Sequence, residues 1–153
     1  MALTLKQIDN FVVETRNYNH DLLVHVGKSL AEYTTYGVGG KAALFCEVQH
    51  AEDVSWLVQT CRRDHIDYFI LGGGSNVLVN DSGFEGLIIK LGKNFKNLEC
   101  DADAGIITCG CACTLAKVAN TAKGAGLSGM EFSAGTPGTI GGAIKMNAGT
   151  ATD

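Results

Sequence analysis

The chain has 153 residues and a formal net charge of −4, with 12 Lys and Arg residues spread along its length. This acidic, scattered charge argues against nucleic acid as the partner. A hydrophobic share of 46% is enough for a folded core, and no apolar run reaches the roughly 18 residues of a membrane span. The length predicts one domain or two small lobes.

The N-terminus and the cysteines predict the compartment. The first ten residues, MALTLKQIDN, lack the basic and apolar regions of a secretion signal, so we expect a cytoplasmic protein. The six cysteines are then expected as reduced thiols. Cys109, Cys111 and Cys113 alternate and would share one face of a strand, but this is not the spacing of a zinc site. We therefore expect no metal and interpret the cysteines as small apolar side chains.

The first predicted element is a short helix over residues 5–14. Thr4 and Gln7 have the spacing of a capping box, and apolar residues follow at helical intervals. Residues 16–20 are expected as a loop, and residues 21–26 as a second short element.

A strand, a helix and a second strand come next. Residues 42–48 are predicted as a strand, residues 53–64 as an amphipathic helix, and residues 68–71 as a strand. Before them lies the hydroxyl-rich segment 34–40, which either offers hydroxyls and the aromatic Tyr36 to a ligand or is a plain loop. The strand–helix–strand order predicts a βαβ unit, whose ligands gather at the carboxyl ends of its strands.

Three consecutive glycines, Gly72 to Gly74, follow the second strand directly. Such glycines can turn with positive φ and direct several amides toward one anion, and Ser75 and Asn76 add side-chain donors. The alternative is a tight turn that needs glycine for its geometry alone. The dinucleotide fingerprint is absent, because its third glycine is missing and residues 77–79 form an apolar, strand-like run instead.

A second lobe is expected to begin near residue 92, after a strand over residues 86–91. Residues 106–113 alternate as a strand, and Thr114 can cap a helix. The inner face of this helix is expected to consist of Leu115, Val118, Ala119 and Ala122.

The last stretch is again rich in glycine. Glycines occur at positions 135, 138 and 141, with Gly142 adjacent and hydroxyls interleaved. A segment with so few side chains can lie flat against a ligand, or it can be a junction packed tightly against the first lobe. Two anion-capable glycine segments in one small acidic protein favour a large phosphate-bearing cofactor. Four to six charge-assisted hydrogen bonds of about 1.5–3 kcal/mol each would suffice for micromolar binding.

Several motifs occur together in the order and spacing of one family: TTYGVGG at 34–40, LGGGSNVLV at 71–79, GMEF at 129–132, AGTPGTIGGA at 134–143 and MNAG at 146–149. On these motifs the chain resembles the N-terminal part of the UDP-N-acetylenolpyruvoylglucosamine reductase family, flavoenzymes also called UDP-N-acetylmuramate dehydrogenases. The resemblance covers about residues 30–149.

The resemblance implies an α+β fold, the two-lobed FAD-binding fold of the vanillyl-alcohol-oxidase (PCMH) type, truncated before the substrate domain. We expect a helical extension over residues 1–30, one FAD-binding lobe over residues 31–92 and an incomplete second lobe over residues 93–153. The implied cofactor is FAD, with its diphosphate bound where the two glycine segments converge. The expected cofactor-binding residues are Tyr36, Gly72, Gly73, Gly74, Ser75, Asn76, Val77, Gly135, Thr136, Pro137, Gly138, Thr139, Gly141, Gly142, Ala143 and Asn147.

The resemblance also implies an activity. In the family, hydride passes from NADPH through the flavin to the enolpyruvyl group of a UDP-sugar, forming UDP-N-acetylmuramate for peptidoglycan. The Ser or Cys proton donor, an Arg and a Glu belong to a later substrate domain. No residue here matches them, so no catalytic residue is assigned, and Ser75 and Ser133 are not proposed as the donor. We expect a fragment or one piece of a split reading frame. The alternatives are a stand-alone module that binds FAD or another diphosphate, and an oxidase with the same flavin fold.

Overall fold

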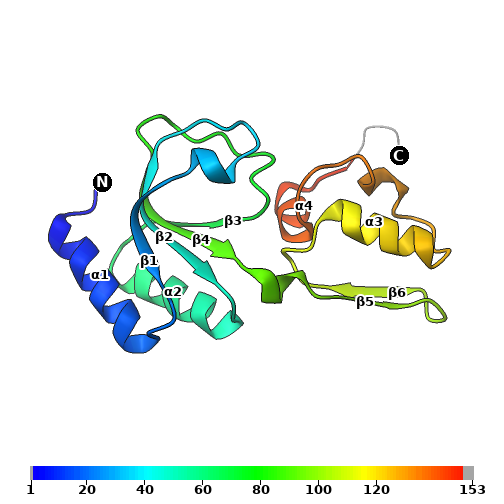
Figure 1. The fold of residues 1–153 in the computed structure, drawn as a ribbon, viewed down its shortest axis with the longest axis horizontal. Coiled ribbons are helices and arrows are strands. Elements are labelled where there is room, and N and C mark those ends of the chain that lie inside the picture. The colour runs from blue at the N-terminus through cyan, green and yellow to red at the C-terminus, as the bar shows by residue number, and fades with distance from the viewer. Residues whose placement is uncertain (1, 150–153) are drawn as a thin grey trace. The chain divides into compact units, whose positions relative to one another are not determined.

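The computed structural model describes residues 2–149. It divides the chain into two compact units, one ending at Leu91 and one starting at Gly92 (Figure 1). The division falls where the sequence pattern places the start of the second lobe. Each unit is described by itself below.

The first unit is built on a four-stranded sheet with the strand order β1-β2-β4-β3 (Figure 1). β1 runs antiparallel to β2, whereas β2 and β3 both run parallel to β4. β4 therefore lies between the two strands of the predicted βαβ unit. The strands are Val24–Ser29 (β1), Lys41–Val48 (β2), Tyr68–Leu71 (β3) and Phe84–Leu91 (β4).

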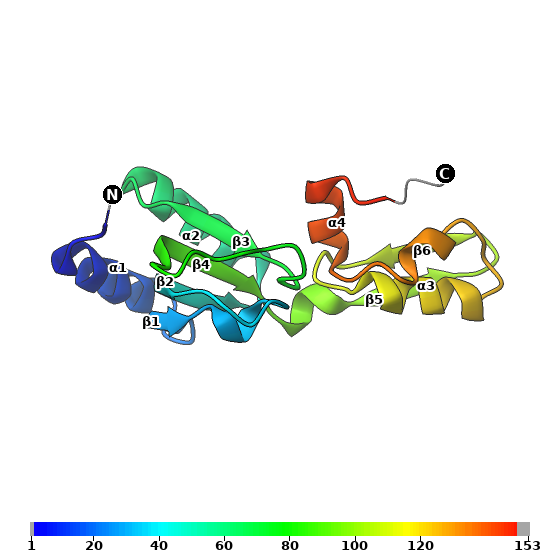
Figure 2. The same ribbon diagram turned by 90° about the horizontal axis from the view of Figure 1, so that it is seen from above.

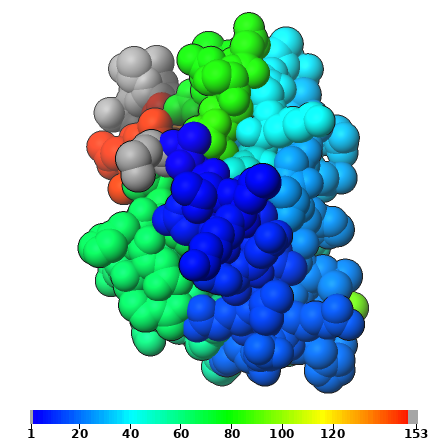
Figure 3. All heavy atoms as spheres, turned by 90° about the vertical axis from the view of Figure 1, so that its left-hand side faces the viewer, coloured from blue at the N-terminus to red at the C-terminus, as the bar shows by residue number. Residues whose placement is uncertain are grey.

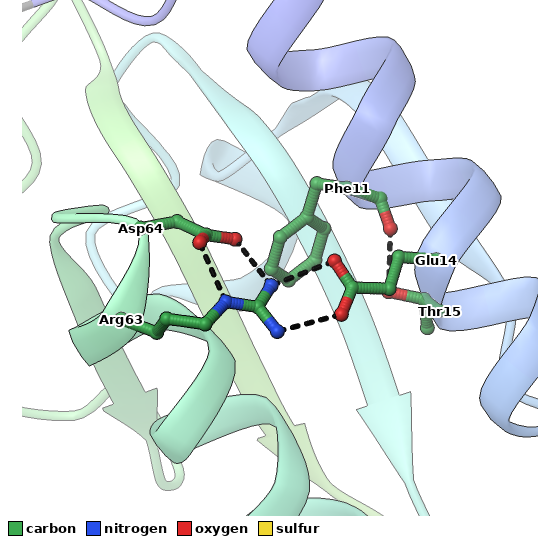
Figure 4. Close-up of polar contacts among 5 residues, drawn as sticks. All are labelled: Phe11, Glu14, Thr15, Arg63 and Asp64. Carbon is green, nitrogen blue, oxygen red and sulfur yellow. Dashed lines mark hydrogen bonds and ion pairs between the residues drawn. The ribbon is translucent and has the colours of Figure 1, made fainter.

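Two helices pack beside this sheet, α1 over Leu5–Tyr18 and α2 over Ala51–Arg63. The predicted capping box of α1 is confirmed: the Gln7 amide donates to Thr4 Oγ1, and the Thr4 amide donates to Gln7 Oε1 at 3.0 Å. The predicted loop at residues 16–20 is wrong for its first three residues, because α1 continues to Tyr18. The buried Thr15, whose Oγ1 donates to the Phe11 carbonyl at 2.8 Å, anchors that additional turn (Figure 4).

The first thirty residues are not a separate helical extension. β1 pairs with β2 from Val24 opposite Cys46 to Ser29 opposite Lys41, so it is an edge strand of the first sheet. The sequence predicted a short element over residues 21–26, but it did not identify the strand or its later bounds, because residues 24–29 include Gly27 and Lys28. Helix α1 (blue in Figure 3) lies against the same unit, with α2 (green) beside it.

Polar and aromatic contacts fasten α1 to α2. The Arg63 guanidinium donates to both Glu14 carboxylate oxygens at 2.8 and 2.7 Å and also to the Asp64 carboxylate (Figure 4). Hydrogen bonding from Arg63 lowers the pKa of Asp64 below its ordinary value. One turn further along, at the C-terminal end of α1, Tyr18 stacks on Trp56 with ring centroids 4.3 Å apart.

The core of the sheet also holds the loops at its edge. Leu30, Ala42, Phe45, Leu71 and Ile88 form one buried cluster, with aromatic and branched side chains packed against it. Two of these side chains come from the predicted apolar run at residues 77–79. That run is not a strand, because its two valines point into this cluster and its backbone joins no sheet. The partly buried members are Tyr33, Val77, Val79 and Phe84.

The second unit contains an antiparallel hairpin of β5 (Leu98–Asp101) and β6 (Ile106–Cys109). Helix α3 (Leu115–Gly124) packs along this hairpin, and α4 (Ile140–Met146) follows it in the chain (Figure 2). Three short 3₁₀ turns complete the described fold: Ala31–Tyr33 in the first unit, and Lys93–Lys96 and Glu131–Ser133 in the second.

The predicted strand over residues 106–113 is wrong in its second half. The strand ends at Cys109, because the chain turns just beyond it, where the Cys113 amide donates back to the Gly110 carbonyl at 2.9 Å. The three alternating cysteines therefore do not share a strand face. Cys109 is half-buried, Cys111 is exposed and Cys113 is buried.

Helix α3 matches its prediction. Thr114 caps it, since its Oγ1 accepts from the Lys117 amide at 3.2 Å. The four residues expected on the inner face are the buried residues of the helix. Among the described residues, no helix is long and apolar enough to cross a membrane.

Candidate cofactor-binding site

Two loops of the first unit run side by side at the end of β3. One is the hydroxyl-rich segment 34–40, and the other is the glycine loop, defined as residues 72–76, with its continuation to Asn80 (Figure 1). The Thr35 amide donates to the Gly74 carbonyl at 3.0 Å, and the Gly40 amide donates to the Asn80 carbonyl at 2.9 Å. The pair lies at the carboxyl end of a parallel strand, where βαβ units hold their ligands.

Gly74 is the point at which these loops approach most closely. It is buried, its φ is +70°, and a methyl group added to it would lie 2.0 Å from the Tyr33 carbonyl oxygen. No side chain fits there without separating the loops. Gly74 is thus a glycine for reasons of packing, and its neighbours in the glycine loop carry the binding potential.

The amides of the glycine loop are available to a ligand. Within residues 2–149, none of the N–H groups of residues 72–76 donates to a main-chain or side-chain acceptor. Gly73 and Asn76 are exposed, and Gly72 and Ser75 are half-buried. A row of open donors this close together could bind an anion through the main chain.

Two carbonyl groups of the same loop, those of Gly72 and Gly74, accept hydrogen bonds, in contrast to its amides. Besides the bond from Thr35 to Gly74, the Lys90 ammonium donates to the Gly72 carbonyl. Lys90 stands in β4 directly opposite Leu71, the last residue of β3. This contact between Lys90 and Gly72 was not predicted from the sequence. The available signal was a single Lys in the apolar strand GLIIKL.

The segment 34–40 adds side-chain groups. Thr34 Oγ1 is buried without a hydrogen-bond partner in the described part of the chain, which is unusual for a hydroxyl. The Tyr36 side chain is 59% exposed. A spare hydroxyl, an aromatic ring and a row of spare amides fit a ligand with a phosphate and a flat ring. Val77, also expected to bind the cofactor, packs its side chain against the core cluster.

The second glycine segment, residues 135–142, has used most of its amides. The Ile140 amide donates to the Cys113 carbonyl at 2.9 Å, and the Gly141 amide to the Cys111 carbonyl at 2.8 Å. The Gly142 amide donates to Thr139 Oγ1 at 3.3 Å, which makes Thr139 the N-cap of α4. The amides of Ile140, Gly141 and Gly142, in the segment expected to bind the diphosphate, are therefore engaged within the second unit.

The remaining predicted residues of the second unit have mixed roles. The Thr136 amide donates to Ser133, and the Ala143 amide to Thr139 inside α4. Asn147 ends α4 in a left-handed conformation with φ of 48°. Pro137 is exposed and has no amide proton to offer. Amides without an acceptor among residues 2–149 are those of Gly135, Gly138 and Thr139.

Cys46 and Cys61, two of the six cysteines, are buried and unreactive. Burial raises the pKa of the Cys46 and Cys61 thiols to about 12 each, so both stay protonated at neutral pH. All six cysteines are free thiols. Over the described ranges of the chain, no three His, Cys, Asp or Glu side chains are grouped as metal ligands.

The sheet, the paired loops and the open amides define an α+β protein with a glycine loop that could hold an anion. A family model described as an FAD binding domain matches residues 42–153. The chain belongs to this FAD-binding domain family, which assigns FAD as its cofactor.

The similar proteins agree with this family. The UDP-N-acetylenolpyruvoylglucosamine reductase of Desulfosudis oleivorans is 40% identical over 125 residues, covering 80% of this chain and 40% of the relative. The reductase of the same name from Prochlorococcus marinus is 39% identical, covering 79% of this chain and 41% of the relative. The chain thus spans about two fifths of the length of these curated relatives.

A solved structure is also similar. The crystal structure of the UDP-N-acetylenolpyruvylglucosamine reductase from Thermus caldophilus matches with a TM-score of 0.65 and 35% identity. The match covers 85% of this chain and 43% of that chain. Together with the family match, it confirms the expected α+β FAD-binding fold.

Proposed function

We propose that the chain is the FAD-binding portion of an NADPH-dependent reductase that converts UDP-N-acetylglucosamine enolpyruvate to UDP-N-acetylmuramate. The names of its relatives and the shared motifs support this reaction. The proposed role lies in peptidoglycan synthesis, and hence in cell-wall formation, cell shape and division. The proposed compartment is the cytoplasm, where six free thiols are chemically reasonable.

The observation that carries the proposal is the glycine loop, whose amides have no acceptor among residues 2–149 while its Gly72 and Gly74 carbonyls are bound. A diphosphate can accept hydrogen bonds from the amides of Gly72, Gly73, Ser75 and Asn76 at about 1.5–3 kcal/mol each. Four such bonds contribute about 6–12 kcal/mol in total. Micromolar binding corresponds to a binding free energy of about −8 kcal/mol. Thr34 and Tyr36 are then available to the rest of the cofactor, and Gly138 and Thr139 are the proposed donors in the second unit.

The division of work follows from these groups. Bound FAD supplies the hydride chemistry. The chain's own residues bind the diphosphate and orient the cofactor through it. No side chain of this chain is proposed as a proton donor. The UDP-sugar, NADPH and a substrate domain corresponding to the remaining length of the relatives are proposed partners.

The experiment is a titration of the purified chain with FAD, followed by quenching of flavin fluorescence. We expect saturable quenching at tens of micromolar or below. Gly73→Val should weaken binding at least about tenfold, because it shields the amides next to it and removes at least one charge-assisted hydrogen bond. Gly124→Val at the end of α3, where a Cβ meets nothing within 4 Å, is the control and should bind as the unaltered chain does.

Two results would overturn the proposal. The unaltered chain, folded by circular dichroism, could leave flavin fluorescence unchanged throughout the titration. Alternatively, Gly73→Val could bind FAD normally, which would place the diphosphate elsewhere.

A second candidate is a stand-alone module that binds FAD or another diphosphate and has no reductase activity. The absence of an assignable proton donor in residues 2–149 favours testing it. The two candidate functions predict different NADPH oxidation when the chain is mixed with the remaining portion of a relative. A reductase portion should then support NADPH oxidation that depends on the UDP-sugar, and a module should not.

A further inference from the structure

Lys90 occupies a distinctive position in the first unit. It lies in β4 opposite Leu71, so its side chain stands where β3 ends and the glycine loop begins. It is half-buried, and its ammonium donates to the Gly72 carbonyl oxygen. A cation is therefore held against the first peptide group of the loop.

The geometry of that peptide group gives the contact a consequence. The peptide between Gly72 and Gly73 is planar and trans, since the described chain contains no cis peptide bond. In a trans peptide the C=O and N–H bonds point in opposite directions. An ammonium that fixes the Gly72 carbonyl therefore turns the Gly73 N–H away from itself, and Gly73 is exposed.

The Gly74 carbonyl is also fixed by a hydrogen bond. The Thr35 amide holds the Gly74 carbonyl at 3.0 Å, and this directs the Ser75 N–H away from the segment 34–40. Glycine has the widest backbone freedom of any residue, so three in a row would otherwise rotate their amides among many directions. Two fixed carbonyls remove much of that freedom before a ligand arrives.

The two anchors differ in charge. The Thr35 amide is neutral, whereas the Lys90 ammonium also polarises the peptide it binds. Hydrogen bonds in a chain strengthen one another, and donors or acceptors that carry charge do so most strongly. The Gly73 N–H should therefore be a stronger donor than an ordinary glycine amide.

We infer that Lys90 is a positioning residue for the diphosphate of the cofactor: it acts through the Gly72–Gly73 peptide, whose amide it orients and polarises. This inference rests on the proposed function, because it assigns a role within the same loop. It needs no contact between Lys90 and the ligand. It predicts that the donor count and charge at position 90 matter to binding, beyond their effect on folding.

The first experiment measures the Kd for FAD in three variants. Lys90→Met keeps the length of the side chain and removes the donor, and it should raise the Kd by about tenfold or more. Lys90→Arg keeps a cationic donor and should bind within about threefold of the unaltered chain. Lys93→Met, at an exposed lysine of the nearby 3₁₀ turn, makes the same change in net charge and should leave the Kd unchanged.

The second experiment follows the Gly73 amide by ¹⁵N–¹H correlation spectroscopy without any ligand. Lys90→Met should shift the Gly73 amide proton upfield, and Lys90→Arg should restore its position. If Lys90 only stabilised the fold, Lys90→Met would lower the melting temperature without shifting the Gly73 amide proton, and Lys90→Arg would have no shift to restore.

The outcomes separate the two claims. If the unaltered chain does not bind FAD, the proposed function fails, and the positioning role fails with it. If the unaltered chain binds FAD and Lys90→Met binds equally well, the proposed function stands and the role of Lys90 is overturned. A Gly73 resonance that does not move in Lys90→Met would also overturn it.

Discussion

The two glycine-rich segments of this chain look alike in sequence and differ in what their backbones do. In the glycine loop, residues 72–76, the carbonyls of Gly72 and Gly74 are bound by neighbouring groups and the amides are open. In the segment 135–142, the amides from Ile140 to Gly142 are bound by neighbouring groups. The first is arranged to receive an anion, and the second is largely a junction that starts a helix.

This difference shows that glycine content alone does not define a phosphate site. What matters is whether the amides already donate hydrogen bonds to nearby carbonyls. In the second unit, the carbonyls of Cys111 and Cys113 accept such bonds, because the strand β6 has ended and leaves them unpaired. In the first unit the neighbouring groups are donors, namely an amide and an ammonium.

The largest expected effect is at Gly74, where the paired loops touch. Gly74→Ala places its Cβ 2.0 Å from the Tyr33 carbonyl, in a backbone conformation with φ of +70°. We expect a loss of about 3 kcal/mol or more in the free energy of unfolding, from strain plus separation of the loops. Urea denaturation of the chain measures it.

Gly37→Ala is the matched control in the same unit. Its φ is +66°, and a Cβ there meets nothing within 4 Å. It should cost only the left-handed conformation, about 1–2 kcal/mol. Equal losses in the two variants would mean that the loops are not in contact at Gly74.

An intermediate effect is expected at Gly141 in the second segment. Gly141→Ala brings its Cβ to 3.0 Å from Cys111 Cβ and 3.1 Å from the Cys111 carbonyl oxygen, which its amide also binds. We expect destabilisation by about 1–2 kcal/mol, with the Kd for FAD changed less than about threefold. A large loss of FAD affinity with unchanged stability would reverse the assigned roles of the two segments.

A smaller effect is expected at Thr139, the N-cap of α4, which is 7% exposed. Thr139→Ala removes the acceptor of the Gly142 amide and should cost about 1 kcal/mol, whereas Thr139→Ser should restore most of it. The main-chain amide at position 139 survives both changes, so FAD binding should be similar in the two variants. If only the alanine variant loses FAD, the hydroxyl is a ligand group.

The smallest effect is expected from the exposed contact between α1 and α2. Arg63 lowers the pKa of Asp64 from its ordinary 3.8, so this contribution is present above about pH 4 and is lost as the pH falls through the lowered pKa. Arg63→Ala should therefore destabilise slightly at pH 7 and not at all near pH 2. Urea midpoints at both pH values measure the difference, and an equal deficit at both would contradict the assignment.

Several elements of both units could be predicted from the sequence pattern. The strand at residues 68–71 has the predicted bounds, and the buried face of α3 consists of the four predicted residues. These features depend on local periodicity and local capping. β1 depends on its pairing with β2, and local patterns do not contain that partner.

The candidate site could likewise be predicted only in part. The glycine loop could be found from three consecutive glycines after a strand. The direction of its amides could not, because that depends on Lys90 and Thr35, which lie elsewhere in the chain. For the same reason, the sequence suggested a second set of open amides in residues 135–142, although the Cys111 and Cys113 carbonyls accept hydrogen bonds from two of them.

The most direct test of the account is the response of the backbone amides to ligand. Uniformly ¹⁵N-labelled chain is titrated with FAD, and the amide resonances of Gly73 and Ser75 are compared with those of Gly141 and Ala143. The account predicts large downfield shifts for the first pair, and small changes for the second pair, whose protons are already bound. Shifts confined to the second pair, or no shift at Gly73 while FAD is bound, would contradict it.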